Sequence, residues 1–348
     1  MSDCQNVNAT ALKSFGDCYW HVHGYVSLAL CIYGVITNII NISILTKNSM
    51  INPINCLLTG IAVADIITMT SYIPFVIHFY LLNSVDITPQ RNSYGWMMFL
   101  TVHLNLTLTS HTASIWLGVI MAIMRYHIIH RSQGRGARAI NCRTSILLIF
   151  CTFGGAAFLV IPNYIITDMR PWPGPPNETQ FWVLDMPIGK NQTDKMAVIT
   201  FLVYPIAGKI IPILLISFFG GLLLRTLWET DKRGRRLKGD NTSSHNQNRR
   251  TTMMLLAIIV MYILSEVPQS VLVILCVAVK DFFRDVYMPL SDIIDVFALI
   301  NSAINFGMYC TMSRQFRTTL TESIDHCLAS CKKKNQHMNG ETTTLTHV

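Results

Sequence analysis

Seven long apolar stretches constrain the fold of this chain more than any other feature. They lie near residues 24–46, 54–83, 96–124, 144–167, 196–224, 251–279 and 287–310. A bilayer core about 30 Å thick needs about 20 helical residues, and in hydrocarbon the backbone must satisfy its own hydrogen bonds. Of the 348 residues, 51% are hydrophobic and only 13% are charged, which excludes a soluble domain. We therefore predict an all-α membrane protein, a bundle of seven transmembrane helices.

The basic residues indicate how these helices are oriented. If the N-terminus lies outside the cell, the inner segments carry 19 Lys and Arg residues and the outer segments carry seven. Because positive flanks are retained in the cytoplasm, we predict a multi-pass plasma-membrane protein with an extracellular N-terminus and a cytoplasmic C-terminus. The net charge of +8 then reflects this topology and contact with acidic membrane lipids, and not nucleic-acid binding.

The sequence divides into three parts. Residues 1–23 are polar and lack the pattern of a removable signal peptide, so we predict an extracellular N-terminus there. Residues 24–326 contain the seven helices and a short amphipathic C-terminal helix at 313–325, where apolar residues recur at helical spacing. Residues 327–348 form a predicted cytoplasmic tail.

Several residues outside the apolar stretches are candidates for modification. Glycosylation sequons on the predicted outer side begin at Asn8, Asn177 and Asn191. Cys327 and Cys331 stand beside three consecutive lysines, a context typical of palmitoylated membrane anchors. Cys4 and Cys18 are the one plainly extracellular pair of cysteines, and the sequence leaves open whether they are bridged.

Motifs in six of the stretches resemble those of rhodopsin-like (class A) G-protein-coupled receptors. They are Asn38, Asp65, Met124-Arg125-Tyr126, Pro212, Pro268 and Asn305-Phe306-Gly307-Met308-Tyr309. Residues 264–269, 301–306 and 312–317 are similar to those of the invertebrate myosuppressin and FMRFamide-like neuropeptide receptors. The resemblance implies a receptor for an extracellular amidated neuropeptide that signals through a heterotrimeric G protein, with Gi/o coupling expected. Arrestin-type regulators would be further partners.

The chain departs from the broad family pattern at several positions. Met124 replaces the usual acid before Arg125, Phe306 replaces the usual proline of the last stretch, and Glu266 stands where an aromatic residue is common. There is no cysteine near the start of the third stretch and none within residues 168–195, so the disulfide usual in the family cannot form there.

Asp65 is the predicted centre of a polar cluster within the membrane. A carboxylate at bilayer depth is costly unless it is paired or hydrated. The matching family positions supply four oxygen-bearing partners, Ser114, Asn301, Ser302 and Asn305. Because such oxygens suit a hard cation, we predict an allosteric sodium ion here and no other cofactor. The alternative is a sodium-free polar network that holds the helices together.

A second group is predicted to couple the receptor to its G protein. It comprises Arg125, Tyr126, Pro212, Pro268 and Tyr309. The resemblance implies that Arg125 contacts the G protein once the 251–279 helix moves away; its alternative role is that of an interfacial arginine whose head group reaches the membrane surface. Each proline permits a helix kink, although kinks also serve packing alone. Glu266 could pair with Lys209, and that bridge would be structural or part of the switch.

Charged and aromatic residues of the outer half are the predicted ligand contacts. They are Asp292, Asp295, Glu266, Lys209, His103, His111 and Trp182. The resemblance implies a peptide ending in Arg-Phe-amide, and Asp292 and Asp295 lie three residues apart on one helix face, where both can reach its guanidinium. Either aspartate could instead cap the helix or pair with Lys280 or Arg284.

Other classes of protein are weaker candidates. A chemosensory receptor for a small molecule would share the fold and is the first alternative, and a membrane transporter is the second. A light-sensing protein would need a lysine in the last stretch, and residues 286–313 contain none. No paired nucleophile and base indicates an enzyme. The identity of the peptide, the G-protein subtype and the oligomeric state stay open.

Overall fold

The computed structural model describes residues 2–84, 86–131, 141–172, 181–185, 200, 202–236, 242–279, 281–326 and 328–329. Its α-helices are α1 (Ser2–Leu45), α2 (Pro53–Val76), α3 (Tyr94–Arg131), α4 (Cys142–Ile166), α6 (Ile211–Arg236), α7 (Thr242–Ala278) and α8 (Met288–Met312). Three π-helical turns, η1 (Ile77–Leu82), η2 (Tyr204–Ile210) and η3 (Phe283–Tyr287), continue α2, α6 and α8 at their outer ends. The strands are β1 (Asp168–Trp172) and β2 (Phe181–Asp185).

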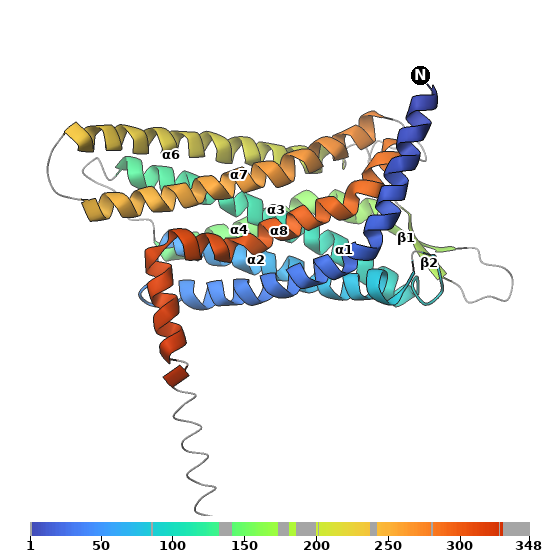
Figure 1. Ribbon diagram of the computed structural model, residues 1–348, viewed down its shortest axis with the longest axis horizontal. Coiled ribbons are helices and arrows are strands. Elements are labelled where there is room, and N and C mark those ends of the chain that lie inside the picture. The colour runs from blue at the N-terminus through green and yellow to red at the C-terminus, as the bar shows by residue number, and fades with distance from the viewer. Residues whose placement is uncertain are drawn as a thin grey trace, which may run out of the picture.

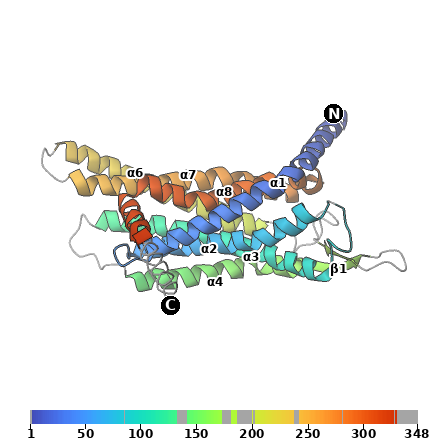
Figure 2. The same cartoon turned by 60° about the horizontal axis from the view of Figure 1, so that its bottom comes forward.

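The helices form an elongated bundle in which they lie side by side (Figures 1 and 2). Six helical spans are long and apolar enough to cross a membrane, and the described apolar part of the seventh covers Ile263–Ala278. The predicted seven-helix bundle is therefore confirmed. The largest difference is at α1, which continues as one helix through the predicted N-terminal segment.

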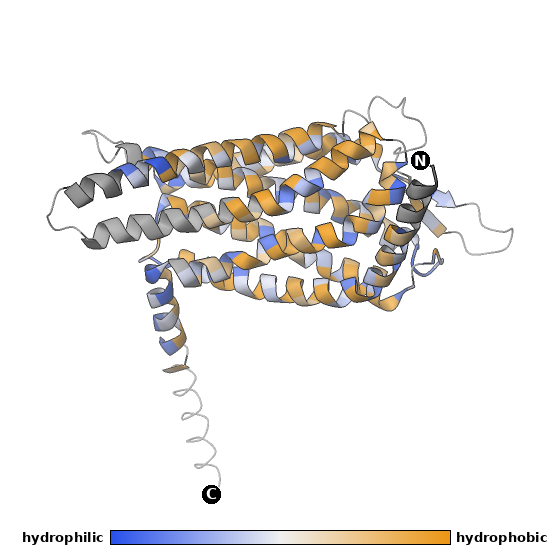
Figure 3. Ribbon diagram, turned by 45° about the horizontal axis from the view of Figure 1, so that its top comes forward, coloured by the Kyte–Doolittle hydropathy of each residue, from blue (hydrophilic) through white to orange (hydrophobic). Residues whose placement is uncertain are grey.

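The surface of the bundle exposes many hydrophobic side chains, and its interior contains both apolar and polar side chains. Hydrophobic residues predominate along the described helices (Figure 3), and many large ones are exposed, with Phe158 of α4 73% exposed. Lipid is the natural solvent for such a face. Inside, α2 and α4 approach closely at Gly60, where a Cβ atom would come within 2.9 Å of Ile149 Cγ1. Buried polar side chains occupy the spaces between the helices, where lipid does not reach them.

The two ends of the bundle carry different structures. The first residues of α1 and an antiparallel hairpin of β1 and β2 lie at one end, and the last residues of α6 and the first residues of α7 lie at the other (Figure 1). At that second end residues 314–326 form a helix that turns away from the bundle axis. It is anchored by buried Phe316 and by the Arg317 guanidinium, which donates to the backbone oxygen of Cys310 at 2.9 Å. The predicted amphipathic helix is thus present.

A bridge between Cys4 and Cys18 does not fit this fold. Both residues lie in the continuous helix α1, and Cys18 is free and exposed. At about 1.5 Å per residue their α-carbons lie roughly 21 Å apart along the helix axis, whereas a disulfide spans at most about 7 Å. The helical form of this segment therefore excludes the bridge that the sequence left open.

Candidate functional site

The end of the bundle that carries the hairpin, which is the predicted outer end, holds the predicted pair of carboxylates. Asp292 accepts a hydrogen bond from the Tyr80 hydroxyl at 2.8 Å, and Asp295 accepts one from the Tyr72 hydroxyl at 3.2 Å. Behind them, His23 Nε2 of α1 lies 3.2 Å from the Tyr72 hydroxyl. Side chains from α1, α2 with η1, and α8 therefore meet around the two acids.

The expected alternative partner of these acids is engaged elsewhere. Arg284 lies with its Nε 2.8 Å from Asp285 and its guanidinium 3.9 Å from Asp281. Pairing of the acids with Arg284 is therefore wrong, and Lys280 lies outside the described residues. Tyrosine hydroxyls are neutral donors, so they solvate the two carboxylates without bringing a positive charge to them. Asp295 also interacts electrostatically with Lys209. Such a pair retains its attraction for a cation.

Aromatic rings surround the acidic pair. Trp20 stacks on Tyr80 at 5.7 Å between ring centroids, and the His23 ring lies 4.7 Å from Tyr80. Deeper in the bundle His103 stacks on Phe75 at 4.7 Å, and it is buried. The structure thus places His103, one of the predicted ligand contacts, in aromatic packing beneath the acidic pair.

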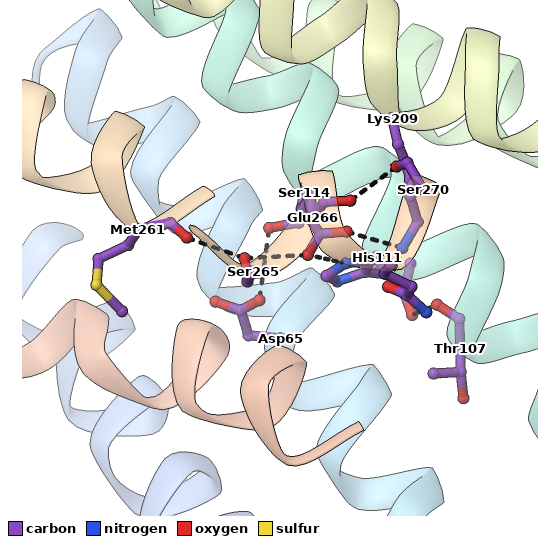
Figure 4. A network of polar contacts seen from close by, with 11 residues as sticks. Asp65, Thr107, His111, Ser114, Lys209, Met261, Ser265, Glu266 and Ser270 are labelled. Atoms are coloured by element: carbon purple, nitrogen blue, oxygen red, sulfur yellow. Dashed lines mark hydrogen bonds and ion pairs between the residues drawn. The ribbon is translucent and has the colours of Figure 1, made fainter. Parts of the chain in front are cut away.

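A buried ionic network joins three helices at mid-depth (Figure 4). Lys209 Nζ donates to Glu266 Oε2 at 2.7 Å and also contacts Gln269. His111 Nε2 lies 2.9 Å from the other oxygen, Glu266 Oε1, to which the Ser265 hydroxyl donates at 3.3 Å. Lys209 and Glu266 are only 2% and 0% exposed. The predicted pairing of these two residues is confirmed, and it includes His111.

Local backbone geometry brings Lys209 into this network. Lys209 lies in η2, the π-helical turn that precedes Pro212. Proline has no N–H to donate into the preceding turn, and a π-turn accommodates such an interruption without ending the helix. The wider turn changes the direction of the side chains along it. The lysine can therefore face α7 instead of lipid.

Asp65 lies deeper still, between α2, α3 and α8. Its Oδ2 accepts from Asn305 Nδ2 at 2.8 Å, and its Oδ1 accepts from the Ser114 hydroxyl at 3.4 Å. Ser302 also hydrogen-bonds to this carboxylate, and Asn301 is buried on the same helix. Three of the four predicted partners, Ser114, Ser302 and Asn305, thus hydrogen-bond to this carboxylate. The carboxylate and hydroxyl oxygens among them are of the kind that a hard cation prefers.

Three of the predicted coupling residues, Arg125, Tyr126 and Tyr309, lie at the end of the bundle opposite the hairpin, the predicted inner end, whereas Pro212 and Pro268 lie within three residues of Lys209 and Glu266. Arg125 of α3 interacts electrostatically with Tyr309 of α8. The Tyr309 ring lies 5.4 Å from Phe316, which belongs to the 314–326 helix, and the Tyr126 ring lies 6.0 Å from Phe219 of α6. Residues from α3, α6 and α8 therefore share one cluster, and Pro268 lies inside the adjacent helix α7.

The remaining predicted residues are placed as follows. Trp182 lies in β2, and its ring packs against Tyr94 at 5.1 Å. Asn8 lies in α1. Asn177, Asn191, Cys327 and Cys331 lie outside the described residues. Their modification stays a prediction.

Sequence reasoning missed the tyrosines that hold the acidic pair. Tyr72 and Tyr80 are eight residues apart, so a helical projection places them on one face. That spacing was available in the sequence. However, aromatic residues near the end of a membrane helix are typical of interfacial belts, and only the packing of α2 against α8 turns these two hydroxyls toward the acids.

Comparison with known proteins identifies the family. Residues 25–326 match the family described as serpentine type 7TM GPCR chemoreceptor Srw. The chain is 30% identical to the G-protein coupled receptor dmsr-1 of Caenorhabditis elegans, over 86% of this chain and 67% of that protein. It is 26% identical to the Sex peptide receptor of Drosophila melanogaster, over 86% and 72%. It is 23% identical to the FMRFamide receptor of D. melanogaster, over 90% and 55%.

The match covers the whole bundle, and the seven helices, the polar interior and the helix after α8 agree with it. The chain belongs to the serpentine seven-transmembrane G-protein-coupled receptor family. It is accordingly a multi-pass membrane receptor and not an enzyme. The resemblance to rhodopsin-like receptors of the invertebrate neuropeptide group, predicted from short motifs, is confirmed by these relatives.

Proposed function

We propose that this receptor binds an extracellular amidated neuropeptide ending in Arg-Phe-amide and signals through a heterotrimeric G protein, with Gi/o as the expected class. The observation that supports this most is the pair Asp292 and Asp295, whose described partners are tyrosine hydroxyls. A guanidinium is a planar cation whose N–H groups can donate paired hydrogen bonds to carboxylates. The adjacent rings of Trp20 and Tyr80 offer an aromatic surface. The names of two relatives, the Sex peptide receptor and the FMRFamide receptor, agree with a peptide ligand.

The polar interior supplies a route from the ligand to the inner end. Asp295 interacts electrostatically with Lys209, and Lys209 is bonded to Glu266 of α7. A ligand cation bound at Asp295 would weaken the attraction between Asp295 and Lys209. It would thereby alter how Lys209 and Glu266 hold α7 in place. Peptide binding would thus favour an arrangement in which α7 swings outward and the cluster around Arg125 opens to the G protein.

Guanine-nucleotide exchange tests the proposal directly. Membranes containing the receptor and purified Gi/o heterotrimer should exchange nucleotide faster when amidated Arg-Phe peptides are added. The same peptides with a free C-terminal carboxylate should act weakly, because the carboxylate would face Asp292 and Asp295. If peptides of this class never stimulate exchange with any G-protein class, while a small molecule does, the chemosensory alternative is correct.

The family name keeps that alternative in view. It describes the matched family as chemoreceptors, whereas three relatives have names that refer to peptides or to peptide-type receptors. Two neighbouring acids that accept hydrogen bonds from neutral tyrosine hydroxyls favour a cationic ligand over a small neutral one. A transporter would instead take up solute without stimulating nucleotide exchange.

We also propose that sodium binds at Asp65. The donor set would be the carboxylate, the hydroxyls of Ser114 and Ser302 and the amide oxygens of Asn301 and Asn305. The Asn305 amide, whose Nδ2 donates to Asp65 at 2.8 Å, would turn over to present its oxygen. Sodium that binds one arrangement better would shift the equilibrium toward it. We expect agonist affinity in sodium chloride to differ several-fold from that in N-methylglucamine chloride of equal ionic strength, and Asp65→Asn to abolish the difference. Equal affinities in both salts would leave only a sodium-free network.

The proposed setting is the plasma membrane, with the N-terminus and the hairpin outside and residues 314–326 inside. Acidic lipids would contact the basic inner segments, and arrestin-type regulators would bind the same inner face as the G protein. Antibodies against tags at each end, applied to intact and permeabilised cells, test this orientation. Staining of the C-terminal tag on intact cells would contradict it.

A further inference from the structure

The hairpin of β1 and β2 is hydrogen-bonded to the bundle through Asn92. The backbone N–H of Trp182 donates to the backbone oxygen of Asn92 at 2.9 Å. In return, Asn92 Nδ2 donates to the backbone oxygen of Trp182 at 3.2 Å. A single asparagine, standing just before α3, thus satisfies both backbone groups of one residue in β2.

The anchor is itself held firmly. Asn92 is only 7% exposed, and its backbone N–H donates to the backbone oxygen of Thr88 at 2.8 Å. Two residues further along the chain, the ring of Tyr94 packs on Trp182 at 5.1 Å. On the other side, His78 Nε2 lies 3.0 Å from the backbone oxygen of Arg91. The segment before α3 is therefore fixed to η1 and to the hairpin at once.

A disulfide cannot join the hairpin to the segment before α3. The sequence contains no cysteine between Cys56 and Cys142, or between Cys151 and Cys276. Neither the segment before α3 nor any part of the hairpin can therefore contribute to a disulfide. The hydrogen bonds of Asn92, together with ring packing, are what the described structure offers in its place.

We propose that Asn92 is a positioning residue for ligand binding. Its two hydrogen bonds to the backbone of Trp182, called the clasp below, hold the β1–β2 hairpin at the ligand-binding end without a disulfide. This rests on the proposed peptide-receptor function. The clasp fixes the position of the hairpin relative to α3. The side chains of β2 therefore already have their ligand-binding arrangement before the peptide binds. Preorganisation of this kind lowers the entropy lost on binding and slows dissociation.

Substitution of Asn92 tests the clasp. Asn92→Ala removes the donor to Trp182, and Asn92→Asp places a negative oxygen against the Trp182 carbonyl. Loss of one such hydrogen bond corresponds to about tenfold in an equilibrium constant. We expect the affinity for an amidated Arg-Phe peptide to fall about tenfold in Asn92→Ala, and further in Asn92→Asp, mainly through faster dissociation. Surface expression should stay near that of the wild type.

Asn55→Ala is the matched control. Asn55 Nδ2 donates to the backbone oxygen of Met50 at 2.6 Å, and Asn55 is buried to a similar degree as Asn92 but lies at the start of α2, outside the segment that holds the hairpin. This variant also loses an amide-to-backbone hydrogen bond, so general destabilisation would appear in both proteins. Only the Asn92 variants should alter peptide dissociation. Equal affinity in Asn92→Ala and the wild type would overturn the proposal.

A redox experiment separates the clasp from a general effect on folding. Residues joined by a backbone hydrogen bond have α-carbons close enough for a disulfide, so the double variant Asn92→Cys with Trp182→Cys should form one. Its peptide affinity should be higher oxidised than after dithiothreitol, whereas wild-type affinity should not respond to dithiothreitol. A reductant-sensitive wild type, or a bridged variant with the same affinity in both states, would refute the positioning role.

A ligand-independent measurement distinguishes failure of the clasp from failure of the proposed function. Amide hydrogen exchange of a peptide fragment covering 181–185 should be faster in Asn92→Ala than in Asn55→Ala and the wild type. If exchange is faster but no amidated peptide binds the wild type, the clasp holds the hairpin and the assigned ligand class is wrong. If exchange is unchanged, the clasp is wrong whatever the ligand.

Discussion

Asp295→Asn is expected to raise the concentration of amidated Arg-Phe peptide needed for half-maximal activation by about 100-fold, because truncating one partner of a buried charge pair costs about 2–5 kcal/mol. The Tyr72 hydroxyl, which donates to the carboxylate at 3.2 Å, can still donate to the amide oxygen of the substituted side chain, so the helix should stay packed. Binding of labelled peptide to membranes, with receptor number measured in parallel, gives the affinity directly.

Two controls sharpen this result. Asp285→Asn removes an acid of the same end that pairs with the exposed Arg284, and it should leave peptide affinity nearly unchanged. A peptide with citrulline in place of arginine keeps the shape and removes the charge. The citrulline peptide should bind the wild type more weakly than the arginine peptide does. This loss of affinity and the loss caused by Asp295→Asn should not add, because both changes remove the same contact. Additive losses would show that the arginine binds elsewhere.

The second large effect is expected at Glu266. Glu266→Gln leaves the ammonium of Lys209 buried without its counter-charge, and breaking a buried pair in this way costs about 3–5 kcal/mol. Such a loss is a large part of the stability of an ordinary domain. We expect the variant to reach the cell surface poorly and to unfold at a clearly lower temperature in detergent. Thermal denaturation of the solubilised receptor measures this.

The matched control for Glu266 is Glu229→Gln. Glu229 of α6 pairs with Arg225 at 3.0 Å on an exposed face, where an ion pair contributes about 0.5 kcal/mol or less. Glu229→Gln should therefore leave the unfolding temperature of the receptor almost unchanged. The double variant Lys209→Met with Glu266→Leu removes both charges and should regain much of the stability. If Glu266→Gln were as stable as the wild type, the network would not restrain α7 as proposed.

Much of the fold and part of the site could be predicted from the sequence. Seven apolar stretches specify seven helices because a backbone in lipid has few other ways to satisfy its hydrogen bonds. The pairing of Lys209 with Glu266 was predictable because two opposite charges at similar depth in hydrocarbon are both costly when alone. The inclusion of His111 was not, since it depends on how α3 is rotated against α7.

The helix ends and the outer hairpin were less predictable. Nothing in the polar residues 2–23 indicates that α1 extends through them, because apolar periodicity there is weak. The strands β1 and β2 stand beside a run of prolines, which favours turns. Their pairing depends on a partner segment and on Asn92, which no local pattern marks.

The sequence alone determined the number of helices, their expected orientation and which polar groups enter the membrane, because these follow from hydrophobicity and charge along the chain. Only the tertiary structure decided which of those groups meet. Tyr72 and Tyr80 face the acids and Lys209 faces α7 because helix packing and the π-turns set the rotation of each helix about its axis. Asn92 meets the hairpin because the turn before α3 lies beside β2. The rotation of the helices depends on contacts between segments far apart in the sequence.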